Sequence, residues 1–155
     1  MRHLNLCLVL IAAGLLSGCI SCKTTFSCPG PSAAYQEVEG LPWGERDAIL
    51  MRLPVERRLD AYHDVYVRSG HPRMMLTNIF EGSAEATFDA AMARMIDPSS
   101  FIEYFWIIHY LALNDGLDVC DPARFGPLSE KASRFQIADP KHPVPIQFNG
   151  CVLPL

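Results

Sequence analysis

The chain lacks an apolar run long enough to cross a bilayer, an excess of positive charge, and the short motifs that mark common enzyme classes. Its N-terminal apolar run, Leu6 to Leu16, has about half the length that a membrane-spanning helix requires. The 13 basic and 17 acidic residues leave a net charge of −4, which argues against a nucleic-acid partner. The sequence contains no G-x-S-x-G elbow, H-E-x-x-H pair, phosphate-binding glycine loop or D-x-D-x-D-G calcium loop. We therefore predict no enzyme, no metal site and no cofactor.

The N-terminus carries the strongest motif in the sequence. A basic start at Arg2 precedes the apolar run from Leu6 to Leu16, and small residues then lead into a cysteine in Leu16-Ser17-Gly18-Cys19. This order of segments is the layout of a secretory signal. The tetrad resembles the lipobox of bacterial lipoproteins.

The resemblance implies cleavage before Cys19, attachment of diacylglycerol to its thiol, and acylation of the new terminus. In the Gram-negative pattern, Ile20 in place of Asp implies export to the outer membrane, with the protein facing the periplasm. The lipid membrane is then one expected partner, because several acyl chains together give stable anchoring. The alternative is an ordinary secretory signal in which Cys19 is incidental.

Composition divides the chain into three segments. Residues 1–18 form the predicted signal peptide. Residues 19–40 are predicted to be a lipidated tether, because they contain Pro-Gly-Pro at 29–31 and show no helical or alternating period. Residues 41–155 are predicted to fold as a single domain, since this length suits one hydrophobic core.

The remaining cysteines predict disulfide bonds. Cys7 leaves with the signal and Cys19 is taken by lipid, so an even number remains in an oxidising compartment. These cysteines are Cys22, Cys28, Cys120 and Cys151. Four cysteines allow three connectivities, of which the spacing favours Cys22 with Cys28 and Cys120 with Cys151. The alternative, a zinc site, lacks the paired C-x2-C spacing that such sites use.

Helical patterns follow one another from Leu41 to Asn114 and predict five helices. The first four are expected from Trp43 to about Arg52, from Val55 to Arg68, from Pro72 to Phe80, and from a cap at Ser83 to a stop at Pro98. For the fifth, Ser100 and Glu103 have the spacing of a capping box. Residues 101–113 then read FIEYFWIIHYLAL, apolar nearly all round, so we expect this helix to be enclosed by the others.

The C-terminal segment beyond Gly116 is rich in proline and lacks a clear period. We expect an extended tail laid over the helices, with one short helix from Leu128 to Phe135 as an option. The fold class that we predict is all-α, an irregular bundle or stack of four to five helices with this tail. Stacked hairpins similar to HEAT repeats are the alternative, although the helix spacing is too uneven for a true repeat.

Polar residues of the second predicted helix offer the main candidates for chemistry. Asp60, His63 and Asp64 lie within one turn, where an imidazole between carboxylates could bind a metal or act as a base. We favour instead a solvated acidic face of Glu56, Asp60 and Asp64, neutralised by Arg57 and Arg68, with His63 at its edge. This acidic face is the candidate contact surface for a partner.

Two further sets of polar residues lie in the second half of the chain. His109 stands within the apolar fifth helix, where we expect a buried histidine hydrogen-bonded to a carbonyl or a tyrosine. Asp115, Asp118 and Asp121 recur every third residue, and oxygen-rich loops can hold Ca²⁺. Their spacing does not match the calcium loops, so we expect capping and turn roles.

The sequence thus predicts a lipid-anchored protein of the bacterial envelope that acts by binding another envelope or secreted protein. One form of this function is an immunity or inhibitor protein that neutralises an envelope-acting toxin or hydrolase. The alternative is a structural or assembly lipoprotein of an envelope or secretion complex. An enzyme is the third and least supported class, since no catalytic motif is present.

Overall fold

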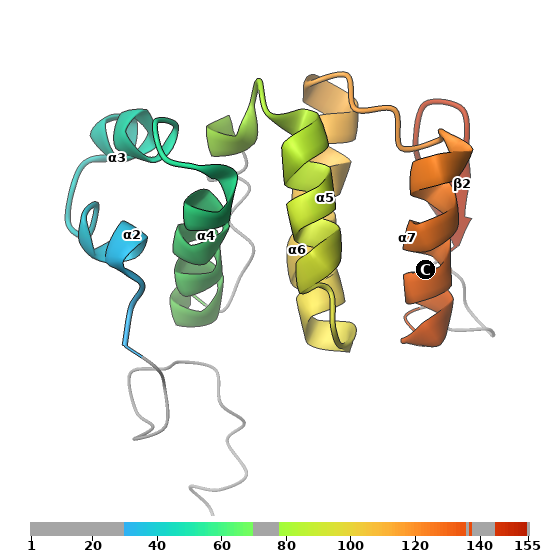
Figure 1. Cartoon of the computed structure of the whole chain (residues 1–155), viewed down its shortest axis with the longest axis horizontal. Coiled ribbons are helices and arrows are strands. Elements are labelled where there is room, and N and C mark those ends of the chain that lie inside the picture. The colour runs from blue at the N-terminus through green and yellow to red at the C-terminus, as the bar shows by residue number, and fades with distance from the viewer. Residues whose placement is uncertain (1–29, 70–77, 136, 138–144, 155) are drawn as a thin grey trace, which may run out of the picture.

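The computed structural model describes residues 30–69, 78–135, 137 and 145–154. Six helices and two short strands follow in chain order: α2 (Ala33–Gln36), α3 (Trp43–Leu50), α4 (Val55–Ser69), α5 (Ala84–Arg94), α6 (Pro98–Asn114), α7 (Pro122–Arg134), β1 (Pro145–Gln147) and β2 (Val152–Pro154). Helices α4, α5 and α7 stand side by side with nearly parallel axes, and α6 lies behind α5 (Figure 1). The predicted all-α bundle is confirmed.

Helix α4 forms where its apolar stripe predicts. Val55, Leu59, Tyr62 and Tyr66 recur at helical spacing, and Leu59 and Tyr62 are fully buried. The helix runs from Val55 to Ser69, so its predicted limits hold to within one residue. Helix α3 ends at Leu50, slightly before the predicted end at Arg52.

The predicted third helix falls mostly outside the described residues. Its last residues, 78–80, form a single 3₁₀ turn in which Ile79 and Phe80 are fully buried. Ser83 then occupies the N-cap position of α5, but its hydroxyl donates to the Phe80 carbonyl at 2.7 Å and makes no cap hydrogen bond. The predicted fourth helix is therefore confirmed as an element, while its cap is not.

The capping box predicted for Ser100 and Glu103 is wrong. Helix α6 starts three residues earlier, with Asp97 as N-cap and Pro98 in the first turn. Asp97 Oδ1 accepts a hydrogen bond from the Ser100 backbone at 2.8 Å, and the Ser100 hydroxyl lies 3.0 Å from the Asp97 nitrogen. Ser100 thus occupies the N3 position of the capping box instead of the N-cap, because Asp97, three residues before it, is the better N-cap acceptor.

Helix α6 is the centre of the core, as predicted, but it is not enclosed on all sides. Most of its apolar residues are buried, including Phe101, Phe105, Ile108 and Leu111. By contrast, Trp106 on the same helix is 37% exposed. Among the described residues, no helix combines the length and apolarity that crossing a membrane would require.

The predicted tether is wrong for residues 31–40. Ala34 and Val38 lie in the hydrophobic core, at 0% and 1% exposure, and α2 packs against α4. The Ser32 backbone N–H donates to Asp64 Oδ2 at 2.8 Å, which fixes this segment to α4. The folded part therefore begins by Ser32 rather than at Leu41, because two apolar residues four apart are enough to dock a short helical turn.

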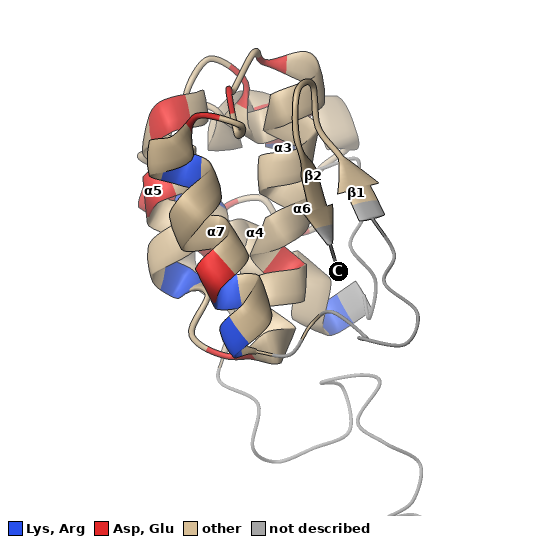
Figure 2. Cartoon of the chain, turned by 90° about the vertical axis from the view of Figure 1, so that its right-hand side faces the viewer, with Lys and Arg blue, Asp and Glu red and all other residues tan. Residues whose placement is uncertain are grey.

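The C-terminal segment is more ordered than the extended tail that we predicted. Asp121 caps helix α7, which begins at Pro122, contains Pro127 and buries Leu128 and Ala132. Strands β1 and β2 then pair antiparallel, with Ile146 opposite Leu153. Figure 2 shows this hairpin beside α6, and its described part carries no charged residue.

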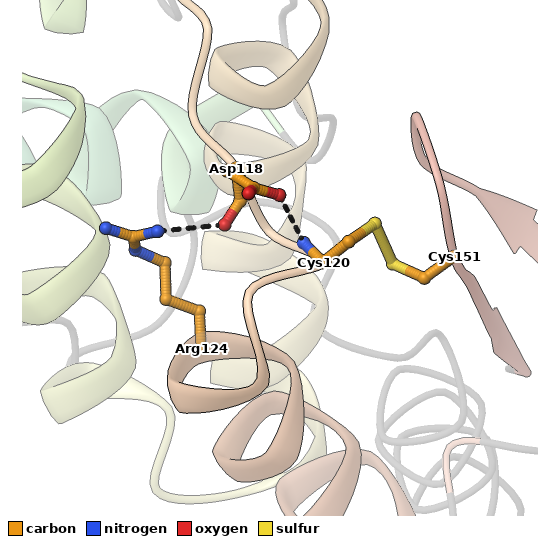
Figure 3. Close-up of a disulfide and its surroundings, with 4 residues drawn as sticks. All are labelled: Asp118, Cys120, Arg124 and Cys151. Carbon is orange, nitrogen blue, oxygen red and sulfur yellow. Dashed lines mark hydrogen bonds between the residues drawn. A yellow bond between two sulfur atoms is a disulfide. The ribbon is translucent and has the colours of Figure 1, made fainter.

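The predicted disulfide between Cys120 and Cys151 is confirmed. The two Cα atoms lie 5.5 Å apart and the bond closes a sequence separation of 31 residues. It ties the hairpin to the turn before α7, where the Cys120 backbone donates to Asp118 Oδ1 and Arg124 donates to the Asp118 carbonyl (Figure 3). Cys19, Cys22 and Cys28 lie outside the described residues, so the lipidation and the second pairing stay predictions.

Candidate functional site

The described residues hold two candidate sites, a polar cluster where α4 meets α6 and an exposed apolar stripe along α6. The cluster centres on His63 of α4 and Glu103 of α6. His63 Nδ1 lies 2.9 Å from Oε1 and 3.1 Å from Oε2 of Glu103. The Glu103 side chain is 5% exposed and that of His63 48% exposed, so a buried carboxylate holds a half-exposed ring.

The environment of this pair favours the protonated imidazole. The hydrogen bond to Glu103 raises the pKa of His63, and burial opposes the rise. Burial and the charge of Glu103 also raise the pKa of Tyr104 to about 12. The Tyr62 hydroxyl donates to the Glu103 backbone carbonyl at 3.2 Å. The cluster is therefore an interlocked polar contact between two helices of the core.

A histidine paired with a carboxylate can also act as a general base in catalysis. Two surface hollows, of about 270 and 490 Å³, are lined by residues of other parts of the fold. The described residues contain no group of three His, Cys, Asp or Glu side chains placed to bind a metal. The geometry therefore fits a structural link between α4 and α6.

The acidic face that we predicted on α4 is only partly a surface. Glu56 is exposed and matches the prediction. Asp60 forms an ion pair with Arg94 of α5 at 2.8 Å. Asp64 is only 9% exposed, and it accepts from Ser32 and pairs with Arg68 at 3.7 Å. The prediction that Asp64 contacts a partner is therefore wrong, because the segment before α2 docks on α4 and covers Asp64.

The pairing of His63 is the other feature that sequence reasoning missed. We placed His63 at the edge of a solvated face, with Asp60 and Asp64 as its neighbours. Its carboxylate partner is instead Glu103, 40 residues away in the sequence. Of the two predicted cations, Arg68 pairs with Asp64 of the acidic face, whereas Arg57 pairs with Glu37 at 3.0 Å. The only signal for the Glu103 contact was a lone carboxylate in an otherwise apolar helix.

The three aspartates near the end of α6 take the capping and turn roles that we expected. Asp115 Oδ2 accepts from the Gly82 backbone at 2.9 Å, and Asp118 Oδ1 accepts from Cys120 at 3.1 Å. Asp121 caps α7 through the Ala123 backbone at 2.8 Å. The contacts of Asp118 and Asp121 are local, as expected. Asp115 is the C-cap of α6, but its side chain joins the helix end to Gly82, before α5.

The second candidate site is an exposed row of side chains that we call the α6 stripe. It consists of Ile102, Trp106, His109 and Leu113, which recur at intervals of four, three and four residues. Ile102, Trp106 and Leu113 are 44%, 37% and 54% exposed, and His109 is half-buried. Side chains at these intervals lie on one face of a helix.

His109 connects the stripe to the C-terminal hairpin. Its ring lies 6.2 Å from Phe105, 5.8 Å from Trp106 and 5.7 Å from Phe148, measured between ring centres. Burial lowers the pKa of His109, so the ring is neutral at neutral pH. We expected His109 to be a buried, hydrogen-bonded histidine. Its main contacts are instead with aromatic rings, and this cluster supports Trp106.

Acidic residues stand at both ends of helix α6. Asp97 caps the start of α6 and is exposed, and Asp115 follows its last residue. Glu81 accepts a hydrogen bond from Tyr110, next to Leu113 along the helix surface. Sequence reasoning missed the stripe because it treated α6 as enclosed, although the four-three-four spacing is visible in the sequence.

Comparison with known proteins gives no relative for this arrangement. No protein-family model, no curated protein and no solved structure matches the chain.

Proposed function

We propose that this chain is a lipid-anchored protein of the bacterial envelope that acts by binding another protein through the α6 stripe. The single observation that carries the binding role is the exposure of Ile102, Trp106 and Leu113 on one face of the central helix. Large apolar side chains gathered on one face of a helix are typical of docking surfaces, and tryptophan is enriched among interface anchors.

The ionisable side chains form contacts within the fold, and this supports a binding role over a catalytic one. His63 holds Glu103, Asp60 holds Arg94, and Asp64 holds the segment before α2. Each contact joins two elements of the fold, so these groups have a structural reason to be present. We therefore propose a binding protein and not an enzyme.

The anchor rests on the lipobox at residues 16–19. A culture labelled with radioactive palmitate should yield a labelled processed protein that begins at Cys19, and Cys19→Ser should abolish the label. Globomycin, which inhibits the lipoprotein signal peptidase, should cause the uncleaved form to accumulate. Palmitate label that persists in Cys19→Ser would contradict the anchor.

The binding role is tested by photo-crosslinking in intact envelopes. A benzoyl-phenylalanine at position 113 should capture a discrete protein, because Leu113 is 54% exposed at the end of the stripe. The matched control is the same residue at position 96, since Ile96 is 74% exposed but lies outside α6. Equal capture at the two positions, or capture at neither, would refute the role of the stripe.

The identity of the captured protein distinguishes the two jobs that we propose. An immunity or inhibitor protein should capture a toxin or hydrolase, and its deletion should sensitise cells to sister cells that release that toxin. An assembly lipoprotein should capture a component of an envelope complex, and its deletion should weaken the envelope without any competitor. We favour the immunity role for a small, acidic, disulfide-stapled domain, and the second phenotype would overturn it.

A further inference from the structure

The hairpin of β1 and β2 is attached to the helices by few interactions. Its strands pair with each other, and the Phe148 backbone donates to the Cys151 carbonyl at 2.9 Å. Among the described residues, no hydrogen bond joins residues 145–154 to a helix. The segment is held by the disulfide to Cys120 (Figure 3) and by the burial of Phe148 and Leu153, which are 3% and 0% exposed. One covalent bond and apolar packing therefore keep the hairpin in place.

The apolar packing alone is a weak attachment. Each strand has three residues, and a two-stranded hairpin of this kind is marginally stable at best on its own. The Phe148 ring lies 6.2 Å from Phe105 and 5.7 Å from His109, measured between ring centres, so a few side chains make the contact with α6. The disulfide adds to the attachment by restricting the free chain. Once the bond is broken, Phe148 and Leu153 must order the hairpin largely by themselves.

The helices do not depend on the hairpin for most of their core. Apart from Phe148 and Leu153, every buried apolar residue of the described chain comes from residues 34–132. Helix α6 packs against α5, and α4 packs against both α2 and α5. Segments with few contacts to the rest of a fold open as local units at low free-energy cost. We therefore expect the hairpin to leave α6 as a unit while the helices stay folded.

The disulfide is accessible from the surface. Both cysteines are only partly buried. Cys120, but not Cys151, lines a surface hollow of about 270 Å³, and the exposed Asp118 lines it too. A Cβ atom at Gly150 would lie 3.8 Å from the Cys120 Sγ, so glycine leaves this side of the sulfur uncovered. An incoming thiolate can thus approach the Cys120 Sγ through the hollow, and exposed disulfides are the ones open to exchange.

We propose that the bond between Cys120 and Cys151 is a redox switch, which a protein dithiol of the Cys-x-x-Cys type opens so that the hairpin leaves α6. One thiolate of the dithiol attacks the Cys120 Sγ, the bond between the two sulfurs breaks, and Cys151 leaves as a thiolate that takes up a proton. The second thiol of the dithiol, once deprotonated, displaces Cys120 in the same way. The dithiol is oxidised to a disulfide, and two electrons and two protons pass to the two cysteines.

The switch changes the surface that α6 presents. In the oxidised protein Phe148 covers the rings of Phe105 and His109. Departure of the hairpin uncovers Phe105 and widens the exposed apolar face beside the α6 stripe. This inference goes beyond the proposed function and depends neither on a partner nor on the lipid anchor, because both redox states are prepared from the purified protein.

The first experiment tests reduction of the folded protein. The mature protein with Cys22→Ser and Cys28→Ser, in detergent, is mixed with a thioredoxin whose resolving cysteine is replaced by serine, so that the exchange stops halfway. N-ethylmaleimide then blocks the thiol released from Cys151. We expect a mixed disulfide at Cys120, located by mass spectrometry of the digested complex. A complex that forms only in urea that unfolds the helices, or no complex, would show that the bond is a purely structural crosslink.

Charge tests the approach through the hollow. The Asp118 carboxylate repels an incoming thiolate, and asparagine keeps an oxygen that accepts from the Cys120 backbone. Asp118→Asn should therefore speed reduction by dithiothreitol about threefold at low ionic strength, and less in salt. The matched control is Asp89→Asn, because Asp89 is exposed but lies on α5, outside the hollow. Equal rates for the two variants, or a mixed disulfide at Cys151, would overturn this route.

The second experiment measures what reduction does to the fold. Hydrogen exchange is followed by mass spectrometry before and after dithiothreitol reduces the protein with Cys22→Ser and Cys28→Ser. Peptides that cover residues 145–154 should lose protection, whereas peptides from α4 and α5 should keep it. Oxidised glutathione, added after the reductant is removed, should restore the protection. Loss of protection throughout the helices, or none in the hairpin, would contradict the switch.

Trp106 provides a second readout of the same change. Its ring contacts His109, which loses its contact with Phe148 when the hairpin leaves. In a Trp43→Phe background, reduction should shift the emission of Trp106 while the helical circular dichroism signal stays constant. Failure of these experiments would leave the proposed binding role intact, since that role is tested by crosslinking at position 113 in the oxidised protein.

Discussion

The contact between His63 and Glu103 should make the stability of this protein depend on pH in a defined direction. The proposed perturbation is a double-mutant cycle of His63→Ala, Glu103→Gln and the double variant. His63→Ala leaves the Glu103 carboxylate, 5% exposed, without its partner. Loss of one member of a fully buried ion pair costs about 3–5 kcal/mol. His63 is 48% exposed, so solvent screening reduces the expected loss to about 2 kcal/mol.

The pH dependence follows from the raised pKa of His63 in the folded protein. Its hydrogen bond to Glu103 raises that pKa above the ordinary value of 6.5 found in the unfolded chain. The stabilisation by the charged pair is fully present below the unfolded pKa and is lost as the pH rises through the folded pKa. Asp64 adds to the shift and Arg94 opposes it, so both residues are left intact in every variant.

The assay is equilibrium urea unfolding at about pH 5.5, 7 and 8.5, with the interaction energy taken from the cycle at each pH. The cycle cancels the titration of other histidines, including His109, because they are common to all four proteins. We expect a coupling of about 1–2 kcal/mol at the lowest pH that falls by about 1 kcal/mol at the highest. A coupling that stays constant or grows with pH would refute this reasoning.

Three further predictions concern stability. Cys120→Ser, or reduction of the bond to Cys151, should lower the free energy of unfolding by about 3–4 kcal/mol, given the 31-residue separation, and non-reducing mass spectrometry should show the intact bond. Asp97→Ala should lower the urea midpoint by removing the cap of α6, and an unchanged midpoint would contradict the capping box. Leu111→Ala should cost about 3 kcal/mol because Leu111 is 0% exposed, whereas Leu113→Ala should cost less than about 0.5 kcal/mol. Thermal unfolding measures this pair, and similar losses would show that Leu113 is packed.

Local patterns predicted the helices well where an apolar stripe on one helix face defines the helix. The stripe of α4 and the turn before α5 follow from apolar spacing and from Gly82, whose φ of 73° suits glycine. Prediction was less successful at helix starts. At the start of α6, for example, Asp97 and Ser100 are both possible N-caps, and the structure uses Asp97. The prediction allowed only a short helix from Leu128 to Phe135, whereas α7 begins at Pro122 and continues through Pro127.

The candidate sites were harder to predict, because each depends on which elements meet. The cysteine pairing of Cys120 with Cys151 was predictable, since compartment and spacing restrict the choice. The contact of His63 with Glu103 was not, since nothing local to either residue names the other. Asp64 was predicted to be exposed for the same reason: its cover comes from Ser32, in a segment that composition alone assigned to a tether.

The sequence by itself determined the helical fold class, the disulfide at the C-terminus and the apolar character of α6, because these depend on spacing along one chain segment. Only the tertiary structure decided which sides of α6 are covered. Neighbouring helices and the hairpin bury Phe105 and Leu111 and leave Trp106 and Leu113 exposed, although all four are apolar. Exposure is a property of how elements pack around a residue, so the surface that we assign to binding emerges only when the packing is known.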